Sequence, residues 1–381
     1  MKNRLNDTIS CRALFFIIAF YIGLWSIRIP TIKDQLQTDY VGIGYIFSTF
    51  SIGSILIMIF ANEILKKFPS RTAISFSGIM QGILWLIVPF IHELSIFMFF
   101  SFIFGCCYGI FEVAINLQAS NIEKRQDKSM MSGFHAFFSL GLLSGALCTS
   151  ILLGFNVSFF MNISIYVAAL LPLNIFFASL LFHDLKSAKT NKGNIFFFWP
   201  AIIVILVVLT MNDALVEGGI DSWAALYMRD AIEVEGFYIG IATISFNFFM
   251  VFGRFIGDSI RDKLGIYLFL ISLISFTIIG LIVIFVSDSI LLAVIGFGIC
   301  GFGISSVIPL AFSLAGKIEG VDSAVGISII SISAYGVFMI GPVIMGYIAK
   351  YLGINYVFSP MIILFFMCLL IVVLFKKKIN V

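Results

Sequence analysis

Long apolar stretches dominate this sequence of 381 residues and constrain its fold more than any other feature. Hydrophobic residues make up 61% of the chain and charged residues 11%, whereas soluble domains carry roughly a quarter of charged residues. A helix needs about 20 mainly apolar residues to cross a hydrocarbon core of ~30 Å. Continuous apolar runs lack the alternation of a membrane β-barrel. The sequence therefore predicts an all-α membrane protein.

Twelve stretches are long enough to cross a bilayer, and we expect each to form one transmembrane helix. They cover residues 13–30, 42–62, 73–91, 95–118, 131–154, 159–182, 199–222, 237–256, 266–286, 289–315, 322–349 and 355–375. The only sizeable polar linker, residues 183–198, falls between the sixth and the seventh stretch. We therefore predict an N-terminal six-helix bundle over residues 1–182 and a C-terminal one over 199–381.

Lysine and arginine are distributed unequally between the two sides that these helices define. With both termini in the cytoplasm, 19 of the 23 basic residues face the cytoplasm, and the exceptions are Arg28, Lys33, Arg229 and Lys350. This bias is the one that orients membrane proteins. The net charge of +3 thus reflects topology and does not indicate nucleic-acid binding. The six cysteines show no metal-ligand spacing, so we expect neither a metal nor a cofactor.

The two halves of the chain are similar to each other. The segment NEILKKFP (62–69) aligns with DSIRDKLG (258–265) at an offset of 196 residues, which also carries Gly145 onto Gly341. Two six-helix halves in the same orientation are typical of a large class of secondary transporters. Gly105 and Gly109 lie four residues apart, and so do Gly141 and Gly145. Such pairs of glycines predict that two helices pack closely together.

The segment GRFIGDSIRDKLG (253–265) resembles the loop signature that the major facilitator superfamily carries between the second and third helices of each half. The resemblance implies a cytoplasmic gate, with a tight turn at its last glycine and charged side chains that pair. The gate would consist of Gly253, Arg254, Gly257, Asp258, Arg261, Asp262, Lys263 and Gly265. The first-half copy, residues 66–69, lacks the aspartate and the glycine, so we expect the gate in the second half.

Three further passages narrow this resemblance. They are GLWSIRIPTIKDQL (23–36), NLQASNIEKRQDKSMMSGFHAFFSLGLLSGA (116–146) and EGGIDSWAALYMRD (217–230). Together they resemble a branch of uncharacterised bacterial inner-membrane permeases near the fucose-permease-like members of the superfamily. The resemblance implies a monomeric transporter of the bacterial inner membrane that moves a sugar or another small polar solute with protons. Its partners would be the solute, protons and the lipid bilayer.

Ionisable residues inside a membrane are costly and usually face a cavity or one another. Glu112 lies in the fourth apolar stretch and His135 near the start of the fifth, and counting the helical rise places both at a similar depth. We therefore expect a Glu112–His135 cluster on the inner half of a central cavity, where both groups exchange protons. The alternative is a structural hydrogen bond between two helices. Neighbours on the same helix faces are Tyr108, Asn116 and Ser139.

The seventh stretch carries Asp213, Glu217 and Asp221 at four-residue intervals, on one helix face. Because like charges repel, we expect these carboxylates to face water, bind cations or share protons. The adjacent Gly218 and Gly219 should soften the helix, so that its outer half bends as an extracellular gate.

For several residues near this predicted gate, the sequence allows more than one role. We expect Asp221 and Trp223 near the outer surface, with Trp223 either as an interfacial anchor or stacking on a ring-like solute. Arg28 would neutralise Glu217 or an anionic solute, or else snorkel to the interface. The full set predicted for the outer gate and solute cavity is Arg28, Trp25, Asn212, Asp213, Glu217, Asp221, Asn247 and Tyr335.

Two other functions remain as alternatives. One is proton-coupled efflux of drugs or metabolites, although the fifth stretch lacks the Gly-Pro pair of drug–proton antiporters. The other is a membrane-embedded enzyme that binds a metal through Asp258 and Asp262. Such enzymes need a second acidic pair, and the equivalent first-half positions are Asn62 and Lys66. The sequence therefore favours transport over catalysis.

Overall fold

The computed structural model describes residues 2–127, 130–182, 200–315 and 323–376, and this part of the chain is all helical. The predicted linker, residues 183–198, lies outside the described residues. The chain divides into two compact units, Met1–Lys189 and Thr190–Val381. Within the described ranges, twelve helical spans are long and apolar enough to cross a membrane, six in each unit. The predicted all-α fold with twelve transmembrane helices is confirmed.

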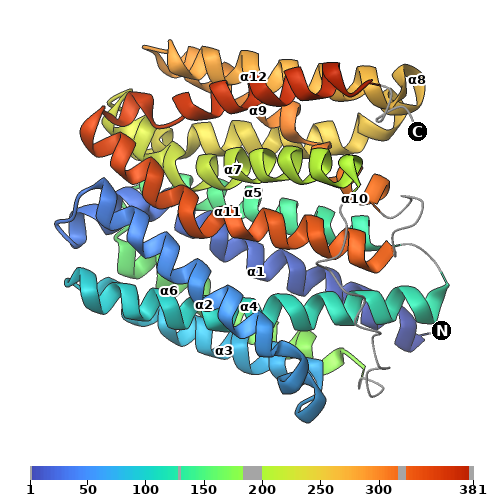
Figure 1. Ribbon diagram of the computed structural model, residues 1–381. Coiled ribbons are helices and arrows are strands. Elements are labelled where there is room, and N and C mark those ends of the chain that lie inside the picture. The colour runs from blue at the N-terminus through green and yellow to red at the C-terminus, as the bar shows by residue number, and fades with distance from the viewer. Residues whose placement is uncertain (1, 128–129, 183–199, 316–322, 377–381) are drawn as a thin grey trace. The chain divides into compact units, whose positions relative to one another are not determined.

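Six helices build unit 1 (Figure 1). They are α1 (Lys2–Gln35), α2 (Tyr40–Lys67), α3 (Ser70–Ile87), α4 (Leu94–Gln126), α5 (Met131–Gly154) and α6 (Phe159–Leu180), with a 3-10 turn, η1 (Val88–Phe90), after α3. Asp39 begins α2 by accepting a hydrogen bond from the Gly42 amide, and Ser158 begins α6 by accepting one from the Met161 amide. In the packed unit, α1 lies against α5, α2 against α4, and α3 against both α4 and α6.

Glycines bring two of these helix pairs together, as predicted. A Cβ added at Gly109 of α4 would lie 2.7 Å from the Ser54 carbonyl oxygen of α2. One added at Gly145 of α5 would lie 3.0 Å from the Phe20 Cα of α1. Because the atoms met are backbone atoms, only a residue without a side chain fits.

Unit 2 contains the remaining spans (Figure 1). Its elements are α7 (Ala201–Asp230), η2 (Gly236–Gly240), α8 (Ile241–Phe285), α9 (Ile290–Ile304), α10 (Val307–Ala315), α11 (Ser323–Tyr351), η3 (Ile354–Tyr356) and α12 (Ser359–Leu374). The long α8 joins two spans across Gly265, whose φ of +77° is not helical. A single span, Ile290–Ala315, is interrupted at Ser305 and Ser306 and so forms α9 and α10. Helix α7 packs against α11, α10 and α12.

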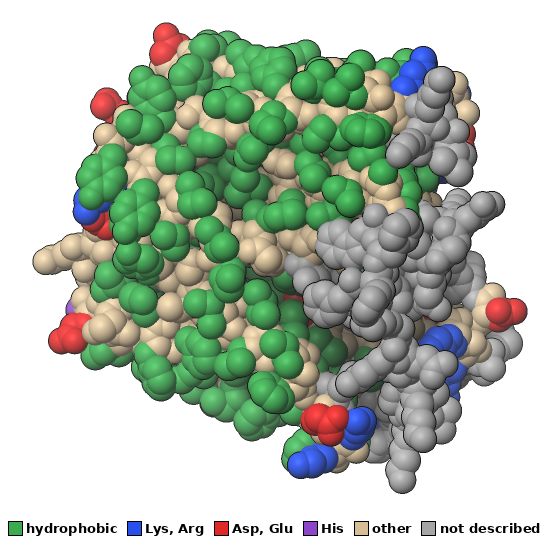
Figure 2. All heavy atoms as spheres, in the orientation of Figure 1, with side chains coloured by type: hydrophobic (Ala, Val, Ile, Leu, Met, Phe, Trp, Pro, Cys, Tyr) green, Lys and Arg blue, Asp and Glu red, His purple; other side chains and the backbone are tan. Residues whose placement is uncertain are grey.

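Several helices extend beyond their predicted ends, and α4 and α7 are two clear cases. Helix α4 continues to Gln126 instead of residue 118, and α7 continues to Asp230 instead of residue 222. Both extensions contain polar residues, which lower the local hydropathy. Hydropathy shows where an apolar run ends, and a helix can continue beyond that point. Apolar side chains cover most of the visible surface around both units (Figure 2), as expected for helices that face lipid.

Candidate functional site

The acidic residues of α7 lie at different depths in unit 2. Asp213 is only 1% exposed, and its Oδ1 accepts no hydrogen bond within the described part of the chain. Glu217 is partly buried, with 26% of its side chain exposed. Asp221 is also partly buried. The three carboxylates share one helix face, but Asp213 points into the bundle of unit 2 while Glu217 remains accessible.

Arg254 of α8 is the cation that pairs with Glu217. Its Nη2 lies 3.5 Å from Glu217 Oε1, and its Nε donates to the Ser305 carbonyl oxygen at 3.1 Å. The resemblance placed Arg254 in a cytoplasmic gate, and that role stays a prediction. Arg254 belongs to the eighth span, Gly236–Gly257, and its side chain joins α7 to the interruption between α9 and α10. Helical spacing alone could not reveal a partner 37 positions away.

Two glycines of the segment 253–265, Gly253 and Gly257, make room for the interruption between α9 and α10. A Cβ at Gly253 would overlap Ser305, and one at Gly257 would overlap Ser306. These glycines therefore let α8 approach the interruption, while Arg254 satisfies a carbonyl group there. This part of the motif packs helices inside unit 2.

Asp221 is held by Asn247 of α8. The Asn247 Nδ2 donates to Asp221 Oδ1 at 3.0 Å and to the Thr243 carbonyl oxygen at 3.0 Å, and Asn247 is fully buried. Asp221 is thus hydrogen-bonded inside unit 2, with nine further residues of α7 beyond it, and its predicted interfacial position stays a prediction. Trp223 is likewise fully buried and is not an interfacial anchor.

Gly218 and Gly219 of α7 allow neighbouring side chains to pack closely against this helix. The helix is continuous from Ala201 to Asp230, and the predicted bend of its outer half stays a prediction. A Cβ at Gly218 would overlap the Phe338 ring of α11, and one at Gly219 would lie 3.1 Å from the Met345 methyl group. The remaining predicted cavity residues of unit 2 contact their own helices, since Asn212 donates to the Val208 carbonyl oxygen at 2.8 Å and the Tyr335 ring lies 6.3 Å from the Phe338 ring.

In unit 1, Arg28 is buried and bonded. Only 2% of it is exposed, and it donates to Asn162 Oδ1 at 3.0 Å and to the Val157 carbonyl oxygen at 2.8 Å. It does not snorkel to an interface, and the cation that pairs with Glu217 is Arg254. Trp25, one turn earlier, packs edge-on against Phe47 with ring centroids 5.8 Å apart.

Glu112 and His135 lie at different distances along their helices from the junction of α4 and α5. Glu123 Oε1 accepts hydrogen bonds from the Met130 and Met131 amides, which fixes the level where α4 meets α5. From there Glu112 is eleven residues along α4, ~16 Å, and His135 is four residues along α5, ~6 Å. The predicted Glu112–His135 cluster stays a prediction. The ring of His135 packs on Phe15, with centroids 5.3 Å apart.

The same-face neighbours of these two residues make local contacts. Asn116 Nδ2 donates to the Glu112 carbonyl oxygen at 2.9 Å, and Ser139 Oγ donates to the His135 carbonyl oxygen at 3.3 Å. The Tyr108 ring lies 5.4 Å from Phe50. Glu112 itself is half-buried, next to the apolar core of unit 1.

The C-terminal part of the motif lies at a helix junction. Arg261 Nη2 donates to Asp262 Oδ1 at 2.9 Å, Lys263 is exposed, and Gly265 has a left-handed φ. The side chain of Asp258 lies outside the described residues. Among the described residues, no group of three or more His, Cys, Asp or Glu side chains is placed to hold a metal.

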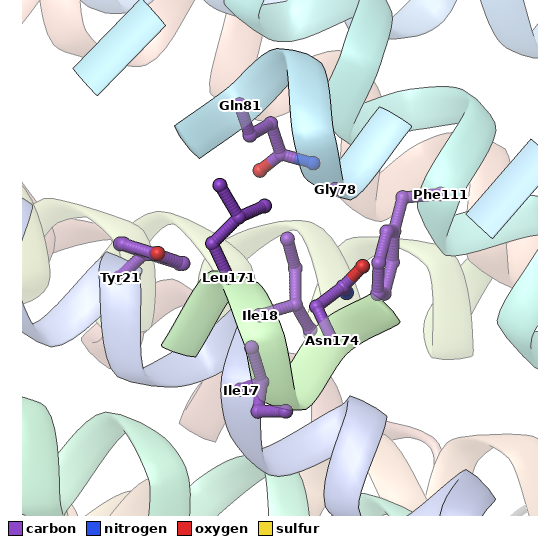
Figure 3. Close-up of a pocket in the computed structure, with 8 residues that line it drawn as sticks. All are labelled: Ile17, Ile18, Tyr21, Gly78, Gln81, Phe111, Leu171 and Asn174. Atoms are coloured by element: carbon purple, nitrogen blue, oxygen red, sulfur yellow. The ribbon is translucent and has the colours of Figure 1, made fainter. Parts of the chain in front are cut away.

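Unit 1 also contains a small cavity that the sequence did not reveal (Figure 3). It lies between α1, α3, α4 and α6, has a volume of about 10 Å³, and is lined by Ile17, Ile18, Tyr21, Gly78, Gln81, Phe111, Leu171 and Asn174. That volume suits one water molecule. The cavity is therefore too small for a solute, although Tyr21, Gln81 and Asn174 each present a buried polar atom that has no hydrogen-bond partner in the described structure.

Taken together, the fold and these residues define a class. The chain crosses the membrane twelve times, and each unit keeps ionisable side chains within its spans. Such residues are expensive to hold in a bilayer and mark paths for ions or polar solutes. The features are those of a membrane transporter.

Comparison with known proteins identifies the family. The family model described as Major Facilitator Superfamily matches residues 12–319, and the chain belongs to this superfamily of transporters. It is 27% identical over 355 residues to an uncharacterised MFS-type transporter of Yersinia pestis, covering 93% of this chain and 92% of that protein. It is 24% identical over 341 residues to the membrane protein MosC of Rhizobium meliloti, covering 90% and 83%.

Solved structures show the same fold. The nucleoside transporter NupG matches with a TM-score of 0.77 at 13% identity, covering 99% of this chain and 100% of NupG. A bacterial homologue of the human lysosomal transporter Spinster, in an inward-facing and unoccupied conformation, matches with a TM-score of 0.77 at 11% identity, covering 99% and 98%. The family and these neighbours identify a transporter and not an enzyme, so the metal-dependent enzyme is set aside.

Proposed function

We propose that this transporter moves a small polar solute, sugar-like or another small metabolite, by alternating access and in symport with protons. We place it in the bacterial inner membrane with both termini in the cytoplasm. Relatives from two bacteria and the basic residues of the predicted cytoplasmic segments support this placement. The fold that the chain shares with a nucleoside transporter is compatible with a polar solute.

The observation that carries this proposal is Glu112. It is an acidic residue in the middle of α4, a span of unit 1. Its backbone carbonyl oxygen accepts a hydrogen bond from the Asn116 side chain, and the aromatic residue Tyr108 lies on the same helix face. A carboxyl group kept in a transmembrane helix marks a solute or proton path by default. We assign proton coupling to Glu112, and the partnership with His135 stays a prediction.

The test requires a solute, which a thermal-shift screen can supply. Purified protein is screened against sugars, polyols, nucleosides, organic acids and common drugs at two pH values. A ligand that binds the native state raises the melting temperature by mass action. Uptake of a hit into proteoliposomes is then measured with the proton gradient imposed in either direction, which separates symport from proton-coupled efflux.

The decisive variant is Glu112→Gln, which removes the proton-binding group and keeps the shape. We expect it to abolish accumulation driven by a proton gradient while solute exchange without a gradient continues. Glu63→Gln is the matched control, because Glu63 is 67% exposed at the end of α2 and should leave both activities unchanged. If Glu112→Gln accumulates the solute as the wild type does, Glu112 does not couple protons to transport.

A further inference from the structure

The small cavity of unit 1 lies among buried side chains within the membrane spans. Helices α1, α3, α4 and α6 line it, and every lining residue except Leu171 is buried. The apolar part of the lining consists of Ile17, Ile18, Phe111 and Leu171, which offer no hydrogen bonds. The polar side chains of the lining come from three different helices. These side chains decide what the cavity can hold.

Each of the three polar side chains brings one polar atom that no described residue satisfies. Tyr21 of α1 is 6% exposed, Gln81 of α3 is 2% exposed and Asn174 of α6 is 3% exposed. The atoms without a hydrogen-bond partner among the described residues are Tyr21 Oη, Gln81 Nε2 and Asn174 Oδ1. Buried polar groups without partners are uncommon in folded proteins. Three of them around one cavity call for a ligand that both donates and accepts hydrogen bonds.

A glycine of α3 brings the Asn174 amide within one helical turn of Gln81. A Cβ added at Gly78 would lie 2.6 Å from Asn174 Nδ2 and closer still to its Oδ1. Gly78 is three residues before Gln81 on the same face of α3, ~4.5 Å along the helix axis. One molecule can bridge two groups about 5.8 Å apart through two hydrogen bonds of ~2.9 Å. Both amides extend into the space between α3 and α6 (Figure 3), so one molecule can reach both.

An aromatic contact holds Tyr21 beside the same turn of α3. The Tyr21 ring stacks on Trp85, with ring centroids 6.1 Å apart and an angle of 16° between the ring planes. Trp85 is four residues after Gln81, on the same face of α3. Tyr21 also lines the cavity. The hydroxyl group of α1 and the two amides of α3 and α6 therefore border one small space.

The size and the polar atoms of the cavity select its ligand. A volume of about 10 Å³ holds one water molecule and no larger solute. An anion would meet the Asn174 oxygen, and a cation would meet the Gln81 N–H group. We propose that the cavity binds one structural water molecule that accepts a hydrogen bond from Gln81 Nε2, donates one to Asn174 Oδ1 and bonds the Tyr21 hydroxyl group. Three hydrogen bonds are typical of a buried water, and this one joins α1, α3 and α6.

The first test is an experimental density map of the full-length wild-type protein, at a resolution that shows ordered water at other buried polar groups. We expect one isolated peak in the cavity, about 2.7–3.2 Å from Gln81 Nε2 and from Asn174 Oδ1, which are hydrogen-bond distances. This test uses the wild type alone, so its result does not depend on the folding of a variant.

The second test is the sign of the change in melting temperature of Tyr21→Phe, which removes only the hydroxyl group. If water bonds that group, the variant loses a hydrogen bond and melts about 2–4 °C below the wild type. If the cavity is dry, the variant loses a buried group without a partner and melts at or above the wild type. Tyr166→Phe shows the size of a lost direct bond, since Tyr166 bonds Thr149 at 3.0 Å. Tyr351→Phe is the neutral control, because Tyr351 is 69% exposed.

A peak in the wild-type map together with a lower melting temperature for Tyr21→Phe supports the water site. The proposal is overturned if the map shows no peak in the cavity. It is also overturned if Tyr21→Phe melts at or above the wild type while Tyr166→Phe melts below it. The water site does not depend on the solute or on proton coupling, so neither result bears on the proposed transport function.

Discussion

A close contact between α1 and α5 in unit 1 gives a prediction whose size follows from the structure. Alanine at Gly145 would place a Cβ 2.9 Å from the Phe20 carbonyl carbon and 3.0 Å from its Cα, and closer still to its carbonyl oxygen. These are backbone atoms of α1, so no side-chain rotation can relieve the overlap. The two helices must separate by roughly 1 Å to restore van der Waals contact.

This separation costs packing along the whole α1–α5 interface. Overpacking of a tight core costs about 1–3 kcal/mol, and for domains of roughly 150–250 residues each kcal/mol lowers the melting temperature by about 2–4 °C. We therefore expect Gly145→Ala to melt several degrees below the wild type in detergent, as measured by intrinsic fluorescence during heating. We also expect the Gly145→Ala variant to give less folded protein in the membrane.

Gly133 of the same helix supplies the control. Its added Cβ would meet only the Arg12 Nη2 atom, at 3.7 Å, which is ordinary contact. In a helix, alanine is favoured over glycine by up to about 1 kcal/mol, so Gly133→Ala should be neutral or slightly stabilised. The reasoning is refuted if Gly145→Ala is as stable as Gly133→Ala, since that would mean that α1 and α5 do not meet closely at Gly145.

Two further substitutions test other features of the fold. Arg28→Lys keeps the charge but cannot reproduce donation to both Asn162 and the Val157 carbonyl oxygen, so we expect a loss of about 1.5–3 kcal/mol; an unchanged unfolding midpoint in denaturant would argue that these bonds do not form. Gly265→Ala places a Cβ in open space at a φ of +77° and should cost about 1–3 kcal/mol through backbone strain alone. Gly336→Ala, also in open space but helical, should be neutral, and equal melting temperatures for the two variants would contradict the left-handed conformation at Gly265.

Hydropathy was sufficient to find the spans of this protein. Each apolar run is a property of consecutive residues, and a bilayer imposes the same length on every helix that crosses it. The glycine pair of α5 was predictable for a similar reason, because residues four apart lie on one helix face whatever the tertiary structure. Helix ends were less accurate, since α7 continues through polar residues to Asp230.

The partners of the charged residues could not be found in this way. Arg254 is 37 positions from Glu217 and 51 from Ser305, and Asn247 is 26 from Asp221. Which of several acids meets one arginine depends on the rotation and depth of helices that are distant in sequence. The motif that contains Arg254 suggested a surface gate, whereas its first residues pack inside the unit.

The sequence by itself determined that the chain lies in a membrane as twelve helices in two sets of six, because hydrophobic length and charge bias act locally and need no partner. Only the tertiary structure decided that Asp213 is buried with no described donor to its Oδ1, that Arg254 bridges Glu217 to the interruption between α9 and α10, and that Arg28 is fixed inside unit 1. The physical reason is that burial and pairing are properties of surfaces brought together by folding, and no single helix carries them alone.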